Sequence, residues 1–381
     1  MRVIPFGKPI IGEEEKLAVG KVLDGSIFVH GPQTKEFESS FSAYTKAPFA
    51  LTTSSCTAAL HLSYFYLGIG ENDEVIIPAQ THTATAHAVE LCRAKPVFVD
   101  SEKETGNIDT EQIESAVTER TRAISVVHYL GMPVNMEKVV SIAKKHNLFV
   151  VEDCALAIGA YFKGVHTGLY GDTGCFSFYP VKHMTTAEGG MLITKDKQIA
   201  EVISRQRAFG VDRHTGERKI PGVYDVKMLG FNYRMNEIEA ALGIQQLKRM
   251  DGFLQKRREN YQFLSRGLAQ IGELAQFKST HGDYISSYYC LSVLLNDKLS
   301  PKRTDIINSL KSKGIGTSVY YPRPVPHFTY YKNKYSYGSQ SFPVASAISR
   351  SSIALPVGPH LDTEDMEYIV EQLKSIIKEV S

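Results

Sequence analysis

Apolar positions along the chain form short continuous runs that alternate with helical patterns between about residue 50 and residue 200. Four runs are rich in β-branched and aromatic residues, at 75–78, 96–100, 123–127 and 148–153. Continuous apolar runs of this length are typical of strands that are covered on both faces. Candidate helices lie between them at 110–117 and 136–146, so the alternation predicts βαβ units around a largely parallel sheet.

Residues 236–254 are rich in Ala, Ile and Leu and predict one long helix. Near its end, at about residue 250, the alternation of strands and helices gives way to a different pattern. Helical patterns recur at about 302–313 and 363–378, and 320–337, rich in Tyr and Pro, predicts a structured loop. The chain of 381 residues exceeds the size at which single cores stop growing, about 250–300 residues. We therefore expect a large α/β domain over 1–250 and a small C-terminal α+β domain over 251–381.

Charge and cysteine content exclude several classes of protein. The 43 Lys and Arg are balanced by 41 Asp and Glu, so there is no basic excess of the kind that binds nucleic acid. No apolar run approaches the roughly 20 residues that a membrane span needs, and no signal-peptide pattern opens the chain. The five cysteines are scattered without CxxC spacing, which indicates neither a disulfide framework nor a metal site. We expect a cytoplasmic protein that binds no nucleic acid, membrane or metal.

The most informative stretch surrounds Lys182, which follows an apolar run and precedes Thr-Thr-Ala-Glu-Gly-Gly. Phe176, Phe178 and Met184 are apolar neighbours that would bury the stem of this lysine. A desolvated lysine has a lowered pKa and becomes a nucleophile toward carbonyl groups. Covalent attachment of pyridoxal phosphate (PLP) requires such a lysine, so Lys182 is the candidate attachment site.

Asp153 ends the predicted strand at 148–153. Ligands of largely parallel sheets bind beyond the carboxyl ends of the strands, where Asp153 is expected. PLP acts as an electron sink only while its pyridine nitrogen stays protonated, and this state needs a carboxylate partner. Asp153 is therefore the candidate partner of that nitrogen.

A cluster of hydroxyl residues at 52–55 leads directly into the helical pattern that begins near Cys56. The N-terminus of a helix offers free backbone N–H groups and a favourable dipole to a phosphate. The hydroxyl groups of Ser55 and Thr57 can add hydrogen bonds. This segment is the candidate phosphate site.

Taken together, these stretches resemble the DegT/DnrJ/StrS-type sugar-nucleotide aminotransferases, PLP enzymes of fold type I with an aspartate-aminotransferase-like large domain. The resemblance covers nearly the whole chain, from Gly31-Pro32 to Leu355-Pro356, and includes 229–235. It implies transfer of an amino group from L-glutamate to a nucleotide-linked keto-sugar. It also implies a homodimer with shared active sites.

The resemblance assigns a role to each candidate residue. Lys182 would carry PLP and move protons between cofactor and substrate, Asp153 would pair with the pyridine nitrogen, and the His82 ring would stack on the cofactor. Asn232 would reach the phosphate from the neighbouring subunit. Phosphate contacts are further implied for Ser177, Cys56 and Thr57. Sugar or pyrophosphate contacts are implied for Arg213, Tyr321 and His327.

Two positions depart from the pattern of these enzymes. Leu156 stands where a glutamine often bonds the phenolic oxygen of the cofactor, and a leucine cannot make that bond. Cys56 stands where glycine or alanine is common, so its backbone N–H is a better phosphate ligand than its thiol.

Three other functions remain open at this point. A sister group of these enzymes removes a sugar 3-hydroxyl and carries histidine in place of the lysine; Lys182 occupies that position here, and His183 follows it. A regulatory relative would bind PLP without turnover. A dinucleotide-binding oxidoreductase would show G-x-G-x-x-G after its first strand, which this chain lacks.

Overall fold

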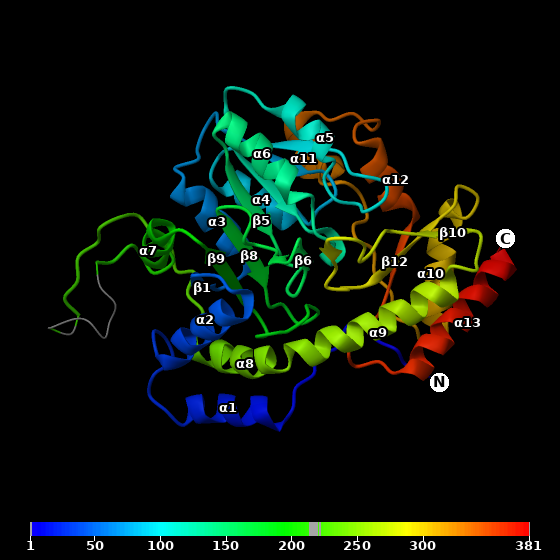
Figure 1. The fold of residues 1–381 in the computed structure, drawn as a ribbon, viewed down its shortest axis with the longest axis horizontal. Helices are drawn as coiled ribbons and strands as arrows, with labels where there is room; N and C mark the ends of the chain where they lie inside the picture. The colour runs from blue at the N-terminus through cyan, green and yellow to red at the C-terminus, as the bar shows by residue number, and fades with distance from the viewer. Residues whose placement is uncertain (1, 213–219, 221, 381) are drawn as a thin grey trace.

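A seven-stranded sheet forms the centre of the computed structural model, which describes residues 2–212, 220 and 222–380. The strand order is β1-β9-β8-β5-β4-β2-β3 (Figure 1). β9 runs antiparallel to both of its neighbours, β1 and β8, and the other pairs in this sheet are parallel, so the sheet is mostly parallel, as predicted. The bounds are β1 Phe49–Thr53, β2 Glu74–Pro78, β3 Lys95–Val99, β4 Thr121–Val127, β5 Phe149–Asp153, β8 Thr173–Ser177 and β9 Gly190–Thr194.

Helices cover both faces of this sheet, which explains why its strands are apolar without alternation. Along β2, Val75 and Ile77 pack against one hydrophobic cluster and Ile76 packs against another on the opposite face. The first cluster includes residues of α3 Cys56–Tyr66, α4 Thr83–Leu91 and α7 Lys197–Gln206. The second includes residues of α6 Met136–His146, whose bounds match the predicted helix.

Three further helices pack at the β1 side of the sheet, where Phe37 and Ile244 belong to a third cluster. They are α1 Glu13–Leu23, α2 Pro32–Thr45 and α8 Glu237–Lys248. The helix predicted at 110–117 is shorter than expected: α5 Thr110–Ile113 passes into the 3₁₀ turn η1 Glu114–Ala116. A small sheet of β11 Tyr284–Ile285, β6 Tyr161–Phe162 and β7 Val165–His166 lies beside these layers.

A second hydrophobic centre surrounds the antiparallel sheet β10-β12-β13. Its strands are β10 Leu274–Gln276, β12 Leu291–Leu295 and β13 Ser352–Leu355, and its helices are α9 Met250–Leu268, α10 Arg303–Ser312 and α13 Thr363–Val380. Ile4, from the other end of the chain, joins this cluster and forms a bridge with Ile315. Both termini therefore lie at this end of the molecule (Figure 1).

Two predictions about the second half are wrong. The expected single helix over 236–254 is divided into α8 and α9, because the chain turns at Arg249, whose N–H bonds back to Gln246 and Leu247. The expected loop at 320–337 contains η5 Val325–His327 and α11 Thr329–Tyr335. Tyr331 of α11 is buried in the same hydrophobic cluster as Val75 and Ile77 of β2. This packing against the main core stabilises α11, which the Pro-rich and Tyr-rich sequence did not predict.

The remaining elements are short or flank the second sheet. They are η2 Tyr129–Gly131, η4 Ser300–Lys302 and α12 Pro343–Ser351. Among the described residues, no helix is both long and apolar enough to cross a membrane.

Candidate active site

A cavity of about 260 Å³ lies at the edge of the main sheet where β4, β5 and β8 end. Parallel strands present their carboxyl ends at one edge, so Val127 and its partner Asp153 both line it. The predicted residues that share this cavity are Ser55, Cys56, Thr57, His82, Asp153, Ser177, Lys182 and Tyr321. A larger, more open hollow of about 570 Å³ between α1, α2 and α8 is lined by none of them.

The Asp153 carboxylate is buried and held by several donors. Oδ2 accepts a hydrogen bond from Thr85 Oγ1 at 2.8 Å, and Oδ1 accepts one from the Ala155 N–H at 3.0 Å. The Cys56 thiol lies 3.9 Å from Oδ1, and burial, followed by the charge of Asp153, raises the pKa of that thiol. A protonated thiol can donate weakly to a carboxylate. Asp153 is thus an oriented carboxylate at the floor of the cavity.

Lys182 lies on the loop after β8, where its backbone N–H bonds to the Tyr179 carbonyl at 2.9 Å. Its Nζ is 5.5 Å from the centre of the Tyr289 ring. Burial lowers the pKa of Lys182, and the nearby Cys56 and Asp153 oppose the shift. The lysine therefore has the environment that favours a neutral, nucleophilic amine.

The N-terminus of α3 points into the cavity. Ser55 is the N-cap, and its hydroxyl accepts from the Ala58 N–H at 3.1 Å. The leading N–H groups of a helix, here those of Cys56 and Thr57, have no acceptor within the helix. Gly190 of β9 passes so close that a Cβ there would lie 2.5 Å from the Cys56 nitrogen, so only glycine fits. The result is a backbone cradle suited to an anion.

His82 and Tyr321 form the opposite wall. His82 is the N-cap of α4, and its Nδ1 accepts from the Ala84 N–H at 3.1 Å. Its ring meets the Tyr321 ring edge-on, with 5.8 Å between centres. Burial raises the pKa of the Tyr321 hydroxyl well above its usual value, so this group remains a proton donor.

Asn232, which the resemblance assigns to the phosphate site of the neighbouring subunit, and His327 do not line this cavity. Asn232 is on an exposed segment, where its side-chain oxygen accepts from Arg234 Nε at 3.0 Å, and it does not line the cavity of its own chain. His327 belongs to η5 and packs near Phe342 rather than in the cavity. Arg213 lies outside the described residues.

The sequence interpretation missed contributors that surround the predicted residues. Thr81 and Glu188 line the cavity, and Thr85 bonds directly to Asp153. For Thr81 and Thr85, the one signal in the sequence is that both threonines lie close to the start of a helix. Hydroxyl residues at such places are usually caps, so the pattern does not separate the two roles.

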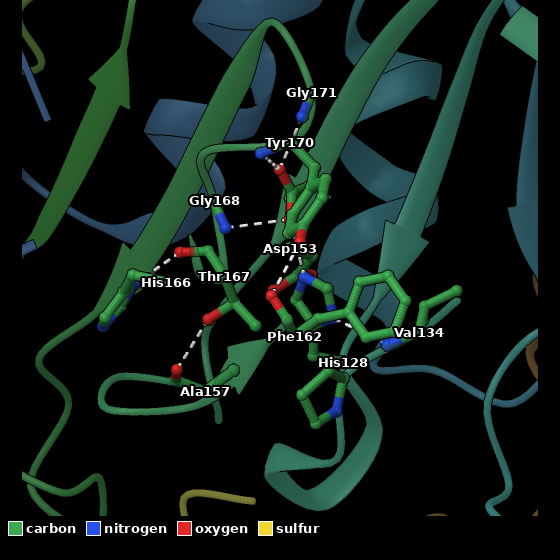
Figure 2. A network of polar contacts seen from close by, with 12 residues as sticks. His128, Val134, Asp153, Ala157, Phe162, His166, Thr167, Gly168, Tyr170 and Gly171 are labelled. Carbon is green, nitrogen blue, oxygen red and sulfur yellow. Dashed lines mark hydrogen bonds and ion pairs between the residues drawn. The ribbon is translucent and has the colours of Figure 1, made fainter. Parts of the chain in front are cut away.

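The neighbouring acid, Glu152, anchors the loop that follows β5. Its carboxylate accepts from His128 Nε2 at 2.9 Å and from the backbone N–H groups of Gly168, Tyr170 and Gly171 at 2.7–2.8 Å. Figure 2 shows these donors converging beside Asp153. Burial acts to raise the pKa of Glu152, but the His128 contact and the Gly171 and Gly168 N–H groups outweigh it and lower the pKa.

Glu152, His128 and Cys154 lie close enough together to suggest a metal site. However, His128 Nδ1 accepts from the Val134 N–H at 3.1 Å, so Nε2 carries the proton that it donates to Glu152. No nitrogen lone pair of His128 is then free for a metal. Hydrogen bonds account for this cluster, which positions β5 and therefore Asp153.

Comparison with known proteins agrees with this arrangement. Residues 9–374 match the model of the DegT/DnrJ/EryC1/StrS aminotransferase family. The chain belongs to this family. It is 36% identical over 375 residues to the GDP-perosamine synthase of Escherichia coli O157:H7, with 98% of each protein covered. The sugar aminotransferase family is therefore confirmed, and this protein is a PLP-dependent sugar aminotransferase.

Solved structures give the same result for the fold. Spr1654 of Streptococcus pneumoniae in its PMP form superposes with a TM-score of 0.94 at 30% identity, covering 99% of this chain and all of that one. PseC of Helicobacter pylori, an aminotransferase involved in the biosynthesis of pseudoaminic acid, gives 0.92 at 27% identity, with 99% and 100% covered. The aspartate-aminotransferase-like fold is confirmed.

The residues of this sugar aminotransferase fit PLP. The cavity contains a buried, oriented carboxylate in Asp153 and a lysine with a lowered pKa in Lys182. It also contains the N-terminus of α3, whose backbone packs against Gly190 so closely that a Cβ there would clash with Ser55 and Cys56. Each feature matches one part of the cofactor: ring nitrogen, aldehyde and phosphate. Spr1654 has also been solved in its PLP form, with a TM-score of 0.93.

Proposed function

We propose that this sugar aminotransferase moves an amino group from L-glutamate to a nucleotide-linked keto-sugar, with Lys182 as its catalytic residue. The observation that carries the proposal is the convergence of Lys182, Asp153 and the α3 N-terminus on one cavity. When bound, PLP supplies an electron sink for the carbon that loses or gains the proton.

Three groups of residues would hold the cofactor. Asp153 would bond its ring nitrogen, because this carboxylate is already oriented by Thr85 and Ala155. The backbone N–H groups of the α3 N-terminus would hold its phosphate, and His82 would face its ring. Additional phosphate contacts would come from the hydroxyls of Ser55, Thr57 and Ser177, which line the same cavity.

Lys182 would both remove and return the proton at the reacting carbon. Burial lowers its pKa, so its Nζ can be neutral when it acts as a base. Catalytic groups work best when their pKa lies near the operating pH, because both protonation states are then accessible. The Tyr289 ring beside Nζ excludes water from one side of the amine.

Substrate contacts would come from the wall opposite Asp153. The Tyr321 hydroxyl lines the cavity and stays protonated, so it can donate to a sugar or carboxylate oxygen. Arg213 and His327 remain predicted contacts for the sugar or the pyrophosphate.

A second copy of the chain would complete the site. An exposed apolar surface formed by Ile27, Phe28, Val29, Phe209, Val226 and Leu229 supports this part of the proposal, with exposed fractions of 42–70%. Arg234 links the stretches that contribute it, because its side chain contacts His30 and lies over the Phe209 ring. Exposed apolar patches of this kind mark protein interfaces. Asn232 lies in the same region and would reach the partner's phosphate site.

We also propose a cytoplasmic location. All five cysteines are buried and unpaired in the structure, which suits a reducing compartment.

The visible absorption spectrum of the PLP-loaded enzyme, recorded before and after L-glutamate is added, tests the donor. We expect loss of the yellow band and formation of the pyridoxamine form, with one 2-oxoglutarate released per site. D-glutamate serves as the matched control. An unchanged band with L-glutamate would mean that another amino donor is used.

The acceptor is identified by supplying the pyridoxamine form with nucleotide-linked 4-keto and 3-keto sugars. We expect return of the yellow band and, by mass spectrometry, a slightly heavier product that has lost one oxygen and gained one nitrogen and three hydrogens relative to its keto precursor. Loss of oxygen without gain of nitrogen would indicate the dehydratase alternative.

A further inference from the structure

The hydroxyl groups of Thr81 and Thr85 form a chain that ends on Asp153. Thr81 Oγ1 lies 2.8 Å from Thr85 Oγ1, which lies 2.8 Å from Asp153 Oδ2. The three side chains are at most 4% exposed, so water does not compete for these contacts. Thr81 precedes the N-cap of α4 and Thr85 lies in its first turn, so both hydroxyls are placed by the start of one helix.

The direction of the chain follows from the number of protons available. A carboxylate only accepts hydrogen bonds, and each threonine hydroxyl has one proton to donate. The proton of Thr85 is directed to Asp153, so the proton between the two threonines must come from Thr81. Hydrogen bonds in such chains polarise one another, which strengthens the bond that Thr85 donates.

The second oxygen of Asp153 is restrained less strongly. Oδ1 accepts from the Ala155 N–H at 3.0 Å, and its contact with the Cys56 thiol, at 3.9 Å, is weak. The backbone contact fixes one oxygen, and without Thr85 the carboxylate could still turn about its terminal torsion. Thr85 is therefore the side chain that sets the plane of the carboxylate.

We propose that Thr85, supported by Thr81, is a positioning residue that sets the orientation of the Asp153 carboxylate for the ring nitrogen of PLP. Thr85 does not line the cavity, so it acts through Asp153 and not by touching the cofactor or the substrate. The inference rests on the role given to Asp153 in the proposed function. It is independent of the amino donor and of the sugar.

The test compares three variants of the full-length protein, stripped of cofactor and titrated with PLP. Thr85→Val keeps the shape and removes the hydroxyl, and Thr85→Ser keeps the hydroxyl and removes the methyl. Thr83→Val is the matched control, because Thr83 lies on the same helix turn but does not line the cavity. PLP affinity and the pH dependence of the visible band are measured for each.

We expect Thr85→Val to weaken PLP binding by about tenfold or more, the effect typical of losing a hydrogen bond to a charged group. The pH at which the visible band changes should also move. Thr85→Ser should restore both to near the wild-type values, and Thr83→Val should alter neither. A purely structural role would lower thermal stability without moving the spectral pH profile.

Wild-type PLP affinity and pH profile in Thr85→Val would overturn the proposal, and so would a Thr85→Ser variant as impaired as Thr85→Val. If Thr85→Val does not fold, Thr81→Val removes only the supporting donor and should shift both readouts in the same direction. None of these measurements uses glutamate or a sugar. Failure of the amino-donor test and failure of this proposal are therefore distinguishable.

Discussion

The Glu237 carboxylate, at the start of α8, accepts the backbone N–H of Gly31 at 3.0 Å. The same carboxylate accepts from the Gln33 and Thr34 N–H groups and from the Thr34 hydroxyl, so one buried side chain caps α2 from another helix. A Cβ at position 31 would lie 2.4 Å from Glu237, which explains the glycine before Pro32. The contact joins segments about 200 residues apart.

Loss of this cap should destabilise the fold. In Glu237→Gln an amide NH₂ would face backbone N–H donors in a buried place, and we expect the free energy of unfolding to fall by roughly 2 kcal/mol. Urea denaturation of the apo-protein measures the change. Glu36→Gln, an exposed substitution on α2, is the control and should have little effect. Equal stability of the two variants would contradict the capping role.

Lys182→Ala should abolish turnover. The variant loses both the attachment point and the base, and removal of a positioned acid–base group alone typically costs about 10²–10⁴-fold in rate. Glutamate-dependent loss of the visible band and product formation are the measurements. Because Lys182 lies on a loop, we expect the variant to keep its fold and its dimeric state. Retained activity in Lys182→Ala would refute its assignment.

The buried His166 should make stability depend on pH. Its Nδ1 donates to the Thr167 carbonyl (Figure 2). Its Nε2 accepts from the Gly159 N–H, so the folded protein holds the neutral ring. Burial lowers the pKa of His166 from 6.5 to about 4, although the Thr167 contact opposes the shift. A second proton on Nε2 would face the Gly159 N–H.

The lowered pKa of His166 determines whether stability rises or falls with pH. Above pH 6.5 the His166 ring is neutral in the folded and in the unfolded protein, so it does not change the free energy of unfolding. Between pH 6.5 and 4 only the unfolded chain takes up the proton. Stability should therefore fall as pH falls through that window, by roughly 3 kcal/mol in total from this residue. His166→Gln should lose that part of the slope in urea titrations, and His281→Gln, at an exposed site, should keep it. An unchanged slope in His166→Gln would contradict the prediction.

Self-association should depend on the apolar surface around Leu229, which is 70% exposed in the single chain. Leu229→Asp places a charge there, and we expect the dimer to dissociate about tenfold or more readily. Light scattering after size-exclusion chromatography, over a concentration series, measures this. Leu91→Asp alters a residue of similar exposure on α4 and should leave the dimer intact. If both variants behave alike, the interface lies elsewhere.

The sequence by itself determined the fold class, the family and several of the residues that gather in the cavity, among them Lys182 and Asp153. Local patterns were sufficient for β2, β4, β5 and α6, because long-range packing agrees with their periodicity. The order of the motifs was sufficient to predict that Lys182 and Asp153 lie in one site, because the carboxyl ends of parallel strands meet at one edge of a sheet. The division into domains near residue 250, the dimer and the substrate stay predictions.

Tertiary structure decided what local patterns could not. The helix at 329–335 forms because Tyr331 is buried against the main core. His327, a predicted substrate contact, does not line the cavity of the folded chain. Thr85 and Glu237 acquired their roles only from contacts with residues far along the chain. The reason is physical: a hydroxyl or carboxylate near a helix start has the same local sequence whether it caps that helix or orients a distant group.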